Sequence, residues 1–130
     1  MKSQIHWKNE RGQALVEFAL VIPIFMMLLL GILQFGIVFN NYITLTDAAR
    51  AGSRVAAVSR LDALRESKAK AAVEDAAGGL DKSKLDVEVD SSWAPGEQVT
   101  VTAKYPYAIN ILGKVVASGD LTTEIKERVE

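Results

Sequence analysis

Glu17 is the residue whose chemical type fits its surroundings least in this sequence. It stands directly before an uncharged apolar run that begins at Phe18, and Gly12 lies five residues before it. A carboxylate inside a bilayer costs up to about 3 kcal/mol at the centre and less near the interface. In a plain anchor helix, leucine would suit this position better. We therefore expect Glu17 to have a partner or a function.

Few other residues could carry chemistry. The sequence contains no Cys, and its only His is His6. Thiol catalysis, disulfides, a histidine metal cluster and a His-based triad are therefore excluded within one chain. The sequence also lacks a nucleophile–base set and a glycine-rich phosphate loop. Lys and Arg number 15 against 16 Asp and Glu, which argues against a nucleic-acid partner. We expect a protein that is not an enzyme and has no metal or cofactor.

The run from Phe18 to Phe39 is the element that must position Glu17. Its 22 residues contain no charged side chain, and Gln34 is the only strongly polar one. As a helix the run would extend about 33 Å, enough to cross a bilayer core of about 30 Å. A cleavable secretory signal would have an apolar core of about 7–15 residues followed by a small-x-small cleavage site, and neither is present. We predict one transmembrane helix over residues 13–39.

A second helical segment is predicted over residues 40–77. Asn40 and Asn41 mark the membrane exit, and the residues that follow are alanine-rich and lack Pro. The stretch SRLD, which begins at Ser59, could cap a second helix, so we expect a bend there. Gly78-Gly79 would end the helical segment.

Small side chains form a ridge in this segment. Ala48, Gly52 and Ala56 recur every four residues, which on a helix permits close approach by another element. Two interpretations stay open, namely packing against neighbouring subunits and packing against this protein's own sheet.

Residues 78–130 are predicted to form a small antiparallel sheet of about three strands. Alternation of apolar and polar residues predicts one strand around Val87 and a second that ends at Pro106, joined by a loop containing Pro95-Gly96. The tail LTTEIKERV (residues 121–129) fits either a strand or a helix, and we favour a third strand. The expected fold class is α+β, with a long N-terminal helix followed by this sheet.

The start of the chain resembles the processing site of type IV prepilins. In that family a short basic leader ends in Gly, and the mature chain has Glu at its fifth position and an aromatic residue at its sixth. Gly12, Glu17 and Phe18 match this pattern. The resemblance implies a leader over residues 1–12 and cleavage by a prepilin peptidase between Gly12 and Gln13. Type IV pilins usually begin with Phe or Met, and this chain would begin with Gln13.

Cleavage would give Glu17 a counter-charge, because it exposes an α-amino group on Gln13. In the pilin families this glutamate is thought to meet the first residue of a neighbouring subunit. A buried ionic pair adds little net stability but selects one alignment over others. The resemblance therefore implies that Glu17 sets the register of stacked subunits.

A longer stretch is similar to the TadE-like family of tight-adherence (Flp) pilus systems. The resemblance rests on RGQALVEFALVIPIF and NNYITLTDAARAGSRVAAV and covers about residues 11–58. It implies a minor pilin or pseudopilin in pilus assembly, with other pilins, the assembly machinery, the prepilin peptidase and membrane lipid as partners. The implied location is the bacterial cytoplasmic membrane, with the N-terminus in the cytoplasm and the C-terminal domain outside, and incorporation in the pilus is open. The alternative is an uncleaved, signal-anchored binding module.

Overall fold

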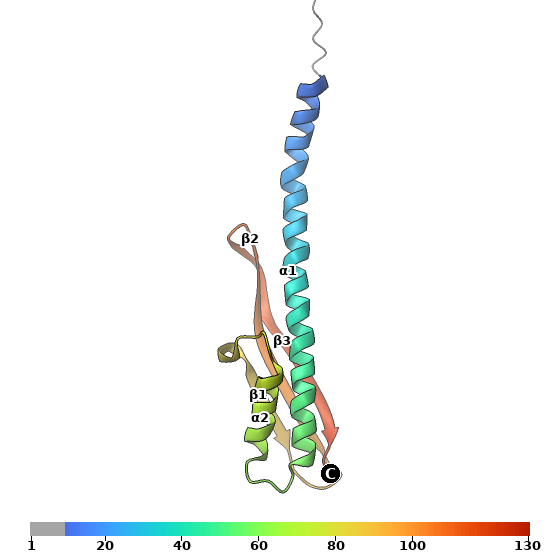
Figure 1. Cartoon of the computed structure of the whole chain (residues 1–130), viewed down its shortest axis with the longest axis vertical. Helices are drawn as coiled ribbons and strands as arrows, with labels where there is room; N and C mark the ends of the chain where they lie inside the picture. Colours follow the sequence, from blue (N-terminus) through green and yellow to red (C-terminus); the bar gives the residue numbers. More distant parts are fainter. Residues whose placement is uncertain (1–9) are drawn as a thin grey trace, which may run out of the picture.

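A single helix, α1, runs without interruption from Glu10 to Val58 in the structure, a computed structural model that describes residues 10–130 and side chains from Gly12 onward (Figure 1). The helix has 49 residues and is about 74 Å long. It continues through Pro23, whose missing N–H removes one hydrogen bond, which membrane helices tolerate. Most of the expected leader, including His6, lies outside the described residues.

A short turn joins α1 to a second helix, α2 (Arg65–Ala76). α1 ends just before Ser59, which confirms the expected bend. The expected side-chain cap is wrong, because Leu64 is the N-cap residue and makes no side-chain cap. The Asp62 carboxylate instead accepts hydrogen bonds from the Leu64 N–H, at 2.9 Å, and from the Lys68 ammonium. The Lys68 and Leu64 bonds hold the pKa of Asp62 below its usual value.

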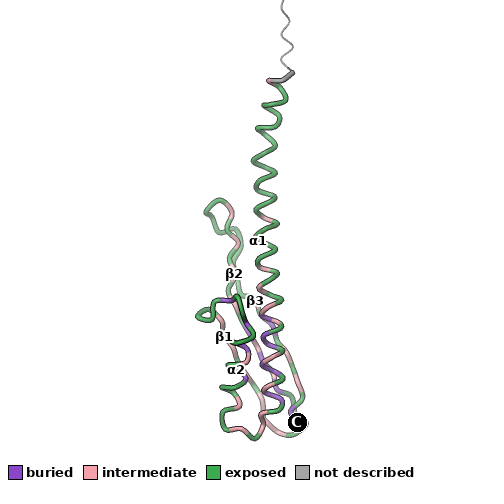
Figure 2. The backbone as a smooth tube through the Cα atoms, viewed as in Figure 1, coloured by how far each residue is buried: buried purple, intermediate pink, exposed green. Residues whose placement is uncertain are grey.

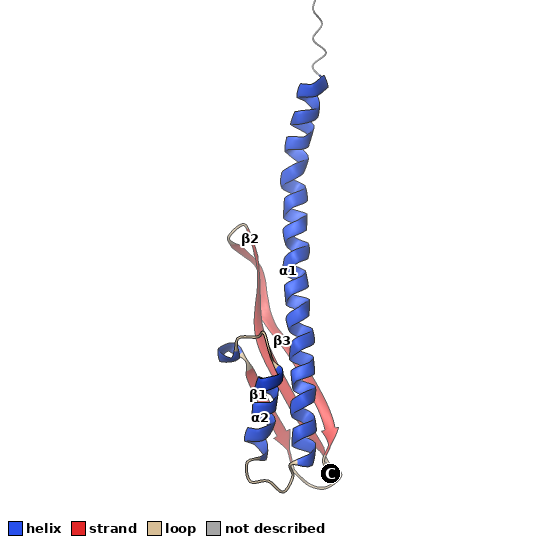
Figure 3. Ribbon diagram, in the orientation of Figure 1, coloured by secondary structure: helices blue, strands red, loops and turns tan. Residues whose placement is uncertain are grey.

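Three antiparallel strands follow the helices. Gly79, at φ +91°, and a short 3-10 helix (Lys82–Lys84) lead from α2 into β1 (Asp86–Ser91). β2 (Gln98–Ile111) and β3 (Lys114–Arg128) complete the sheet, with strand order β1-β2-β3. The helices lie on one face of this sheet (Figure 3). The α+β class, the three strands and the strand in the C-terminal tail are confirmed.

The predicted end of the second strand at Pro106 is wrong. β2 continues to Ile111, and Pro106 pairs with Asp120 of β3. Proline is tolerated in a sheet only where its missing N–H needs no partner, as at an edge. β1 pairs with β2 only as far as Lys104, so by Pro106 β2 is already an edge strand on that side.

The hydrophobic core lies between the sheet and the C-terminal part of α1. Leu45 on α1, Val73 on α2 and Val101 on β2 are fully buried together, and a neighbouring cluster joins Ala56 to Val129. Figure 2 shows buried residues along α1 only where α2 and the sheet accompany it. The predicted segments 40–77 and 78–130 therefore share one core.

The β2–β3 hairpin extends past this core along α1. Its turn consists of Leu112 and Gly113, both at positive φ, between the paired residues Ile111 and Lys114. In the view of Figure 1 the hairpin tip, defined as residues 107–119, reaches the level of the light blue to cyan part of α1. This projection was not predicted from the sequence.

Candidate functional site

The N-terminal turns of α1 bring the expected processing residues onto one continuous helix. Gly12, Gln13, Glu17 and Phe18 all lie within the first nine residues of α1. The Gln13 side-chain amide donates a hydrogen bond to Glu17 Oε1 at 3.1 Å. Residues four apart on a helix face each other, so this contact follows directly from their spacing. The structure thus provides a polar partner for Glu17 from the residue that would become the first of the mature chain.

How strongly the N-terminus of α1 stabilises the Glu17 carboxylate depends on where the helix begins. A helix N-terminus carries a partial positive charge from its free N–H groups, and a carboxylate in the first turns is stabilised there. In the uncut chain α1 already begins at Glu10, two residues before Gly12. A cut after Gly12 would move the helix start to Gln13, and Glu17 would then lie about one turn from the N-terminus.

The part of α1 that follows Glu17 carries apolar side chains that the rest of the protein does not cover. Nearly all of the large hydrophobic side chains from Leu15 to Phe39 are exposed, each by at least 36%. The helix is long and apolar enough to cross a membrane, and its most apolar window is entirely uncovered by the described part of the chain. An exposed apolar surface of this extent requires lipid or other protein around it.

A comparison with protein-family models finds a match to this segment. The model described as "TadE-like protein" matches residues 12–54. The match covers about a third of the chain, so residues 12–54 are similar to the TadE-like family. Neither the comparison with curated proteins nor the comparison with solved structures yields a match.

The TadE-like segment begins at Gly12 and ends inside the folded domain. It contains the four expected processing residues, the apolar span, and the first two residues of the ridge, Ala48 and Gly52, but not Ala56 or the sheet. This similarity supports a pilus-related role, association with pilus components and a membrane-anchored, pilin-like chain.

The ridge of small residues is covered by this protein's own domain. Ala48 and Ala56 are fully buried, and Gly52 is buried between them. A Cβ added at Gly52 would lie 2.2 Å from Val73 Cγ2 and 3.1 Å from the Ala69 carbonyl oxygen of α2. The ridge therefore packs within this chain, and at Gly52 its neighbour is α2, which neither of the two interpretations named.

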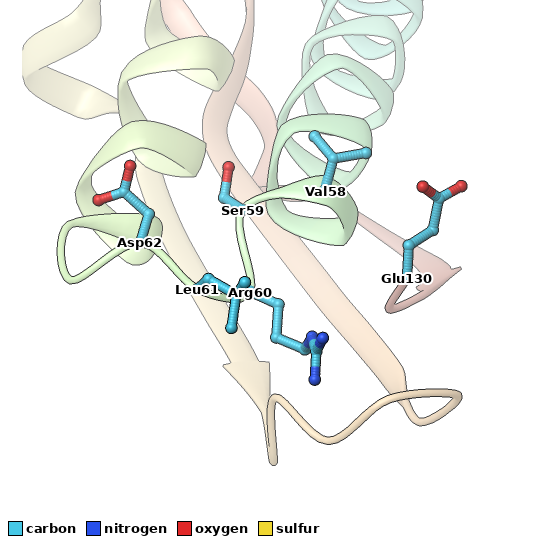
Figure 4. Close-up of a pocket in the computed structure, with 6 residues that line it drawn as sticks. All are labelled: Val58, Ser59, Arg60, Leu61, Asp62 and Glu130. Atoms are coloured by element: carbon cyan, nitrogen blue, oxygen red, sulfur yellow. The ribbon is translucent and has the colours of Figure 1, made fainter.

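A polar hollow lies at the other end of α1, far from Glu17. It has a volume of about 420 Å³ and is formed by the α1–α2 turn and the C-terminal residue (Figure 4). Its lining is Val58, Ser59, Arg60, Leu61, Asp62 and Glu130. The hollow shares no residue with the N-terminal turns, so it forms no part of the candidate site.

The hairpin tip is the exposed apolar feature that the sequence analysis missed. A signal was present, because Tyr107, Ile109 and Ile111 continue the alternation of β2 and Gly113 follows shortly after. The expectation that Pro106 ends the strand concealed this pattern.

Proposed function

We propose that this protein is a minor pilin or pseudopilin that takes part in assembling a tight-adherence pilus and is cleaved after Gly12 by a prepilin peptidase. The observation that carries the proposal is a single carboxylate, Glu17, at the start of the apolar span of α1, whose large apolar side chains are left uncovered by the described part of the chain. The TadE-like match over residues 12–54 supports it, because the matched segment begins at the proposed cleavage site.

The uncovered surface of α1 fits two successive environments. In the membrane, lipid acyl chains would cover its apolar side chains, and the N-terminus would lie in the cytoplasm with the folded domain outside. In a filament, helices of other pilins would replace the lipid. Exchange between the two costs little, because lipid tails and apolar side chains are similar surroundings.

Glu17 would favour the filament over the membrane and would fix how neighbouring helices align. A carboxylate near the membrane boundary gains stability when it meets an ammonium group, and cleavage would create one on Gln13. The Gln13 side chain already contacts Glu17 within one chain, at 3.1 Å. In the assembled state the ammonium of a neighbouring subunit would take this role and align the two helices.

Intact-mass measurement of protein extracted from membranes tests the cleavage. We expect a mature chain of 118 residues beginning at Gln13, which is the 130-residue chain without its first 12. Gly12→Leu should abolish cleavage, because a bulky side chain would hinder the approach of the extended chain to the peptidase.

Gly36→Leu is the matched control for this substitution. A Cβ at Gly36 meets nothing within 4 Å, and its position on α1 is remote from the cleavage site. This variant should be processed like the wild type. A wild-type protein that keeps Met1 while pili assemble normally would refute the proposal and favour an uncleaved binding module.

A further inference from the structure

The hairpin tip exposes apolar side chains that the folding of this chain does not require. Leu112, Val115 and Val116 are 73%, 59% and 62% exposed. Ile109 and Asn110 of β2 pair with Ala117 and Val115 of β3. Val116, between those two, therefore forms a bulge and has no pairing partner on β2. Solvated hairpin ends normally carry polar residues, so this concentration of apolar surface indicates a contact outside the domain.

Leu112 occupies a backbone conformation that disfavours it. Its φ is +50°, and Gly113 follows at +80°. A two-residue turn with positive φ at both positions prefers Asn or Asp before Gly, because a branched side chain is strained there. The presence of a leucine at this place indicates that its apolar side chain is useful at the very end of the hairpin.

The strand pairing limits how far the hairpin tip reaches along α1. The Thr46 and Thr123 hydroxyl oxygens are 3.4 Å apart, which fixes the position of β3 beside α1. From Thr123 to Gly113 the strand extends at most about 33 Å. α1 covers this distance in about 22 residues. The tip therefore stands no further along α1 than about the level of Ile24, within the apolar span (Figure 1).

The apolar part of α1 is longer than one bilayer core. Between Gln13 and Phe39 only Glu17 is charged, and this stretch is about 40 Å long as a helix, against about 30 Å for the core. A core that extended to Phe39 would place the two open edges of the hairpin deep in hydrocarbon, where unpaired backbone groups are not tolerated. A core that begins at Gln13 ends about 20 residues later, near Leu33.

We propose that the hairpin tip inserts into the leaflet on the side of the folded domain, with the boundary of the hydrocarbon core near Leu33 of α1. Leu112, Val115 and the unpaired Val116 would enter the headgroup region and the adjoining acyl chains to about 5–10 Å, as other interfacial elements do. The molecule is then held in the membrane at two places, by α1 and by the tip.

The charge of the hairpin supports a lipid surface as its partner. Residues 98–119 contain no Asp or Glu, while Lys104 and Lys114 are both exposed. The Lys114 stem can lie along apolar surface while its ammonium reaches lipid phosphates. Anionic lipids would therefore strengthen the insertion.

The inference rests on the membrane anchorage of α1 in the proposed function and does not depend on cleavage. Because the chain has no Cys, single cysteines can be introduced into the full-length protein and labelled with an environment-sensitive fluorophore. Leu112→Cys reports the hairpin tip. Leu61→Cys is the matched control, a leucine that is 88% exposed in the α1–α2 turn at the other end of the domain. Leu28→Cys reports the span.

The labelled proteins are reconstituted into vesicles of phosphatidylcholine and phosphatidylglycerol that contain lipids with a shallow spin-label quencher. We expect the label at Leu112 to emit at shorter wavelength than that at Leu61 and to be quenched at least about threefold more strongly. Omitting phosphatidylglycerol should reduce this quenching.

Three outcomes would overturn the inference. Equal, weak quenching at Leu112 and Leu61, with Leu28 shielded from water, would leave the anchorage intact and refute the insertion. A shielded Leu112 label that lipid does not quench would show that a second copy of the chain covers the tip. A water-exposed Leu28 label would refute the anchorage as well.

Discussion

At the scale of single residues, Glu17 costs stability where it stands, next to an apolar span, but it serves the proposed contact between subunits. Its side chain accepts a hydrogen bond from Gln13 at 3.1 Å, but this neutral amide does not compensate its charge. A cationic partner would contribute more, because it adds a Coulomb attraction to the carboxylate that a neutral amide lacks. Among the side chains that the structure describes, Glu17 therefore has a polar partner but no cation, which fits the proposed contact with another subunit.

Glu17→Ala tests this role. Cleavage after Gly12 should continue, because the backbone at the cleavage site is unchanged, whereas assembly should fall at least about tenfold, equivalent to a lost interaction of about 1.4 kcal/mol. The measurement is the amount of pilus protein in sheared filaments, together with the mass of the membrane-extracted protein. Glu17→Asp keeps the charge and should restore part of the yield. A normal yield from Glu17→Ala would remove the argument for register.

At the scale of elements, the contact between α1 and α2 depends on the absence of a side chain at Gly52. The helices approach so closely there that Val73 and the Ala69 carbonyl occupy the place of a Cβ. Because Val73 is fully buried in the core, it has little room to move. The ridge that sequence analysis recognised is thus the point at which α2 is docked on α1.

Gly52→Ala should destabilise the folded domain by about 1–3 kcal/mol through this overlap. The free energy of unfolding is measured by urea titration of the protein in detergent. Gly78→Ala is the control, because a Cβ there meets nothing within 4 Å. Adding Val73→Ala should give a double variant whose loss is smaller than the sum of the two single losses, because the shorter side chain makes room for the new methyl group. Equal stability of Gly52→Ala and the wild type would contradict the docking described here.

At the scale of the whole molecule, α1 has two parts with different surroundings. Its N-terminal part is left uncovered by the described chain, and its C-terminal part belongs to the folded domain. The N-terminal part of α1 has no partner within the described chain, whereas every residue of the buried hydrophobic core lies at or after Leu45. A folded domain on a continuous helix would suit the proposed transfer from lipid to a filament, because the domain can keep its fold while the helix changes its neighbours.

This division predicts that residues 40–130 fold without the span. Since the core is complete from Leu45 onward, the fragment should show the helix and strand signals of circular dichroism and one cooperative thermal transition. Size-exclusion chromatography in mild detergent, which shields the hairpin tip, should give a compact monomer. A fragment without a cooperative transition would show that the span contributes to folding.

The sequence by itself determined the features that depend on local pattern. The uncharged run, the alternation in β1 and the first half of β2, and the spacing of Gly12, Glu17 and Phe18 are all visible within short stretches. Hydrophobic periodicity reports how one element divides its surface between core and solvent, so it predicts element type well.

Only the tertiary structure decided which surfaces meet. β2 can continue through Pro106 because its pairing with β1 reaches no further than Lys104, and no local pattern reveals how far a neighbouring strand extends. The partner of Gly52 depended in the same way on the docking of α2. The level that the hairpin tip reaches along α1 follows from strand register. Register is a relation between two segments, so the sequence of one segment alone does not reveal it.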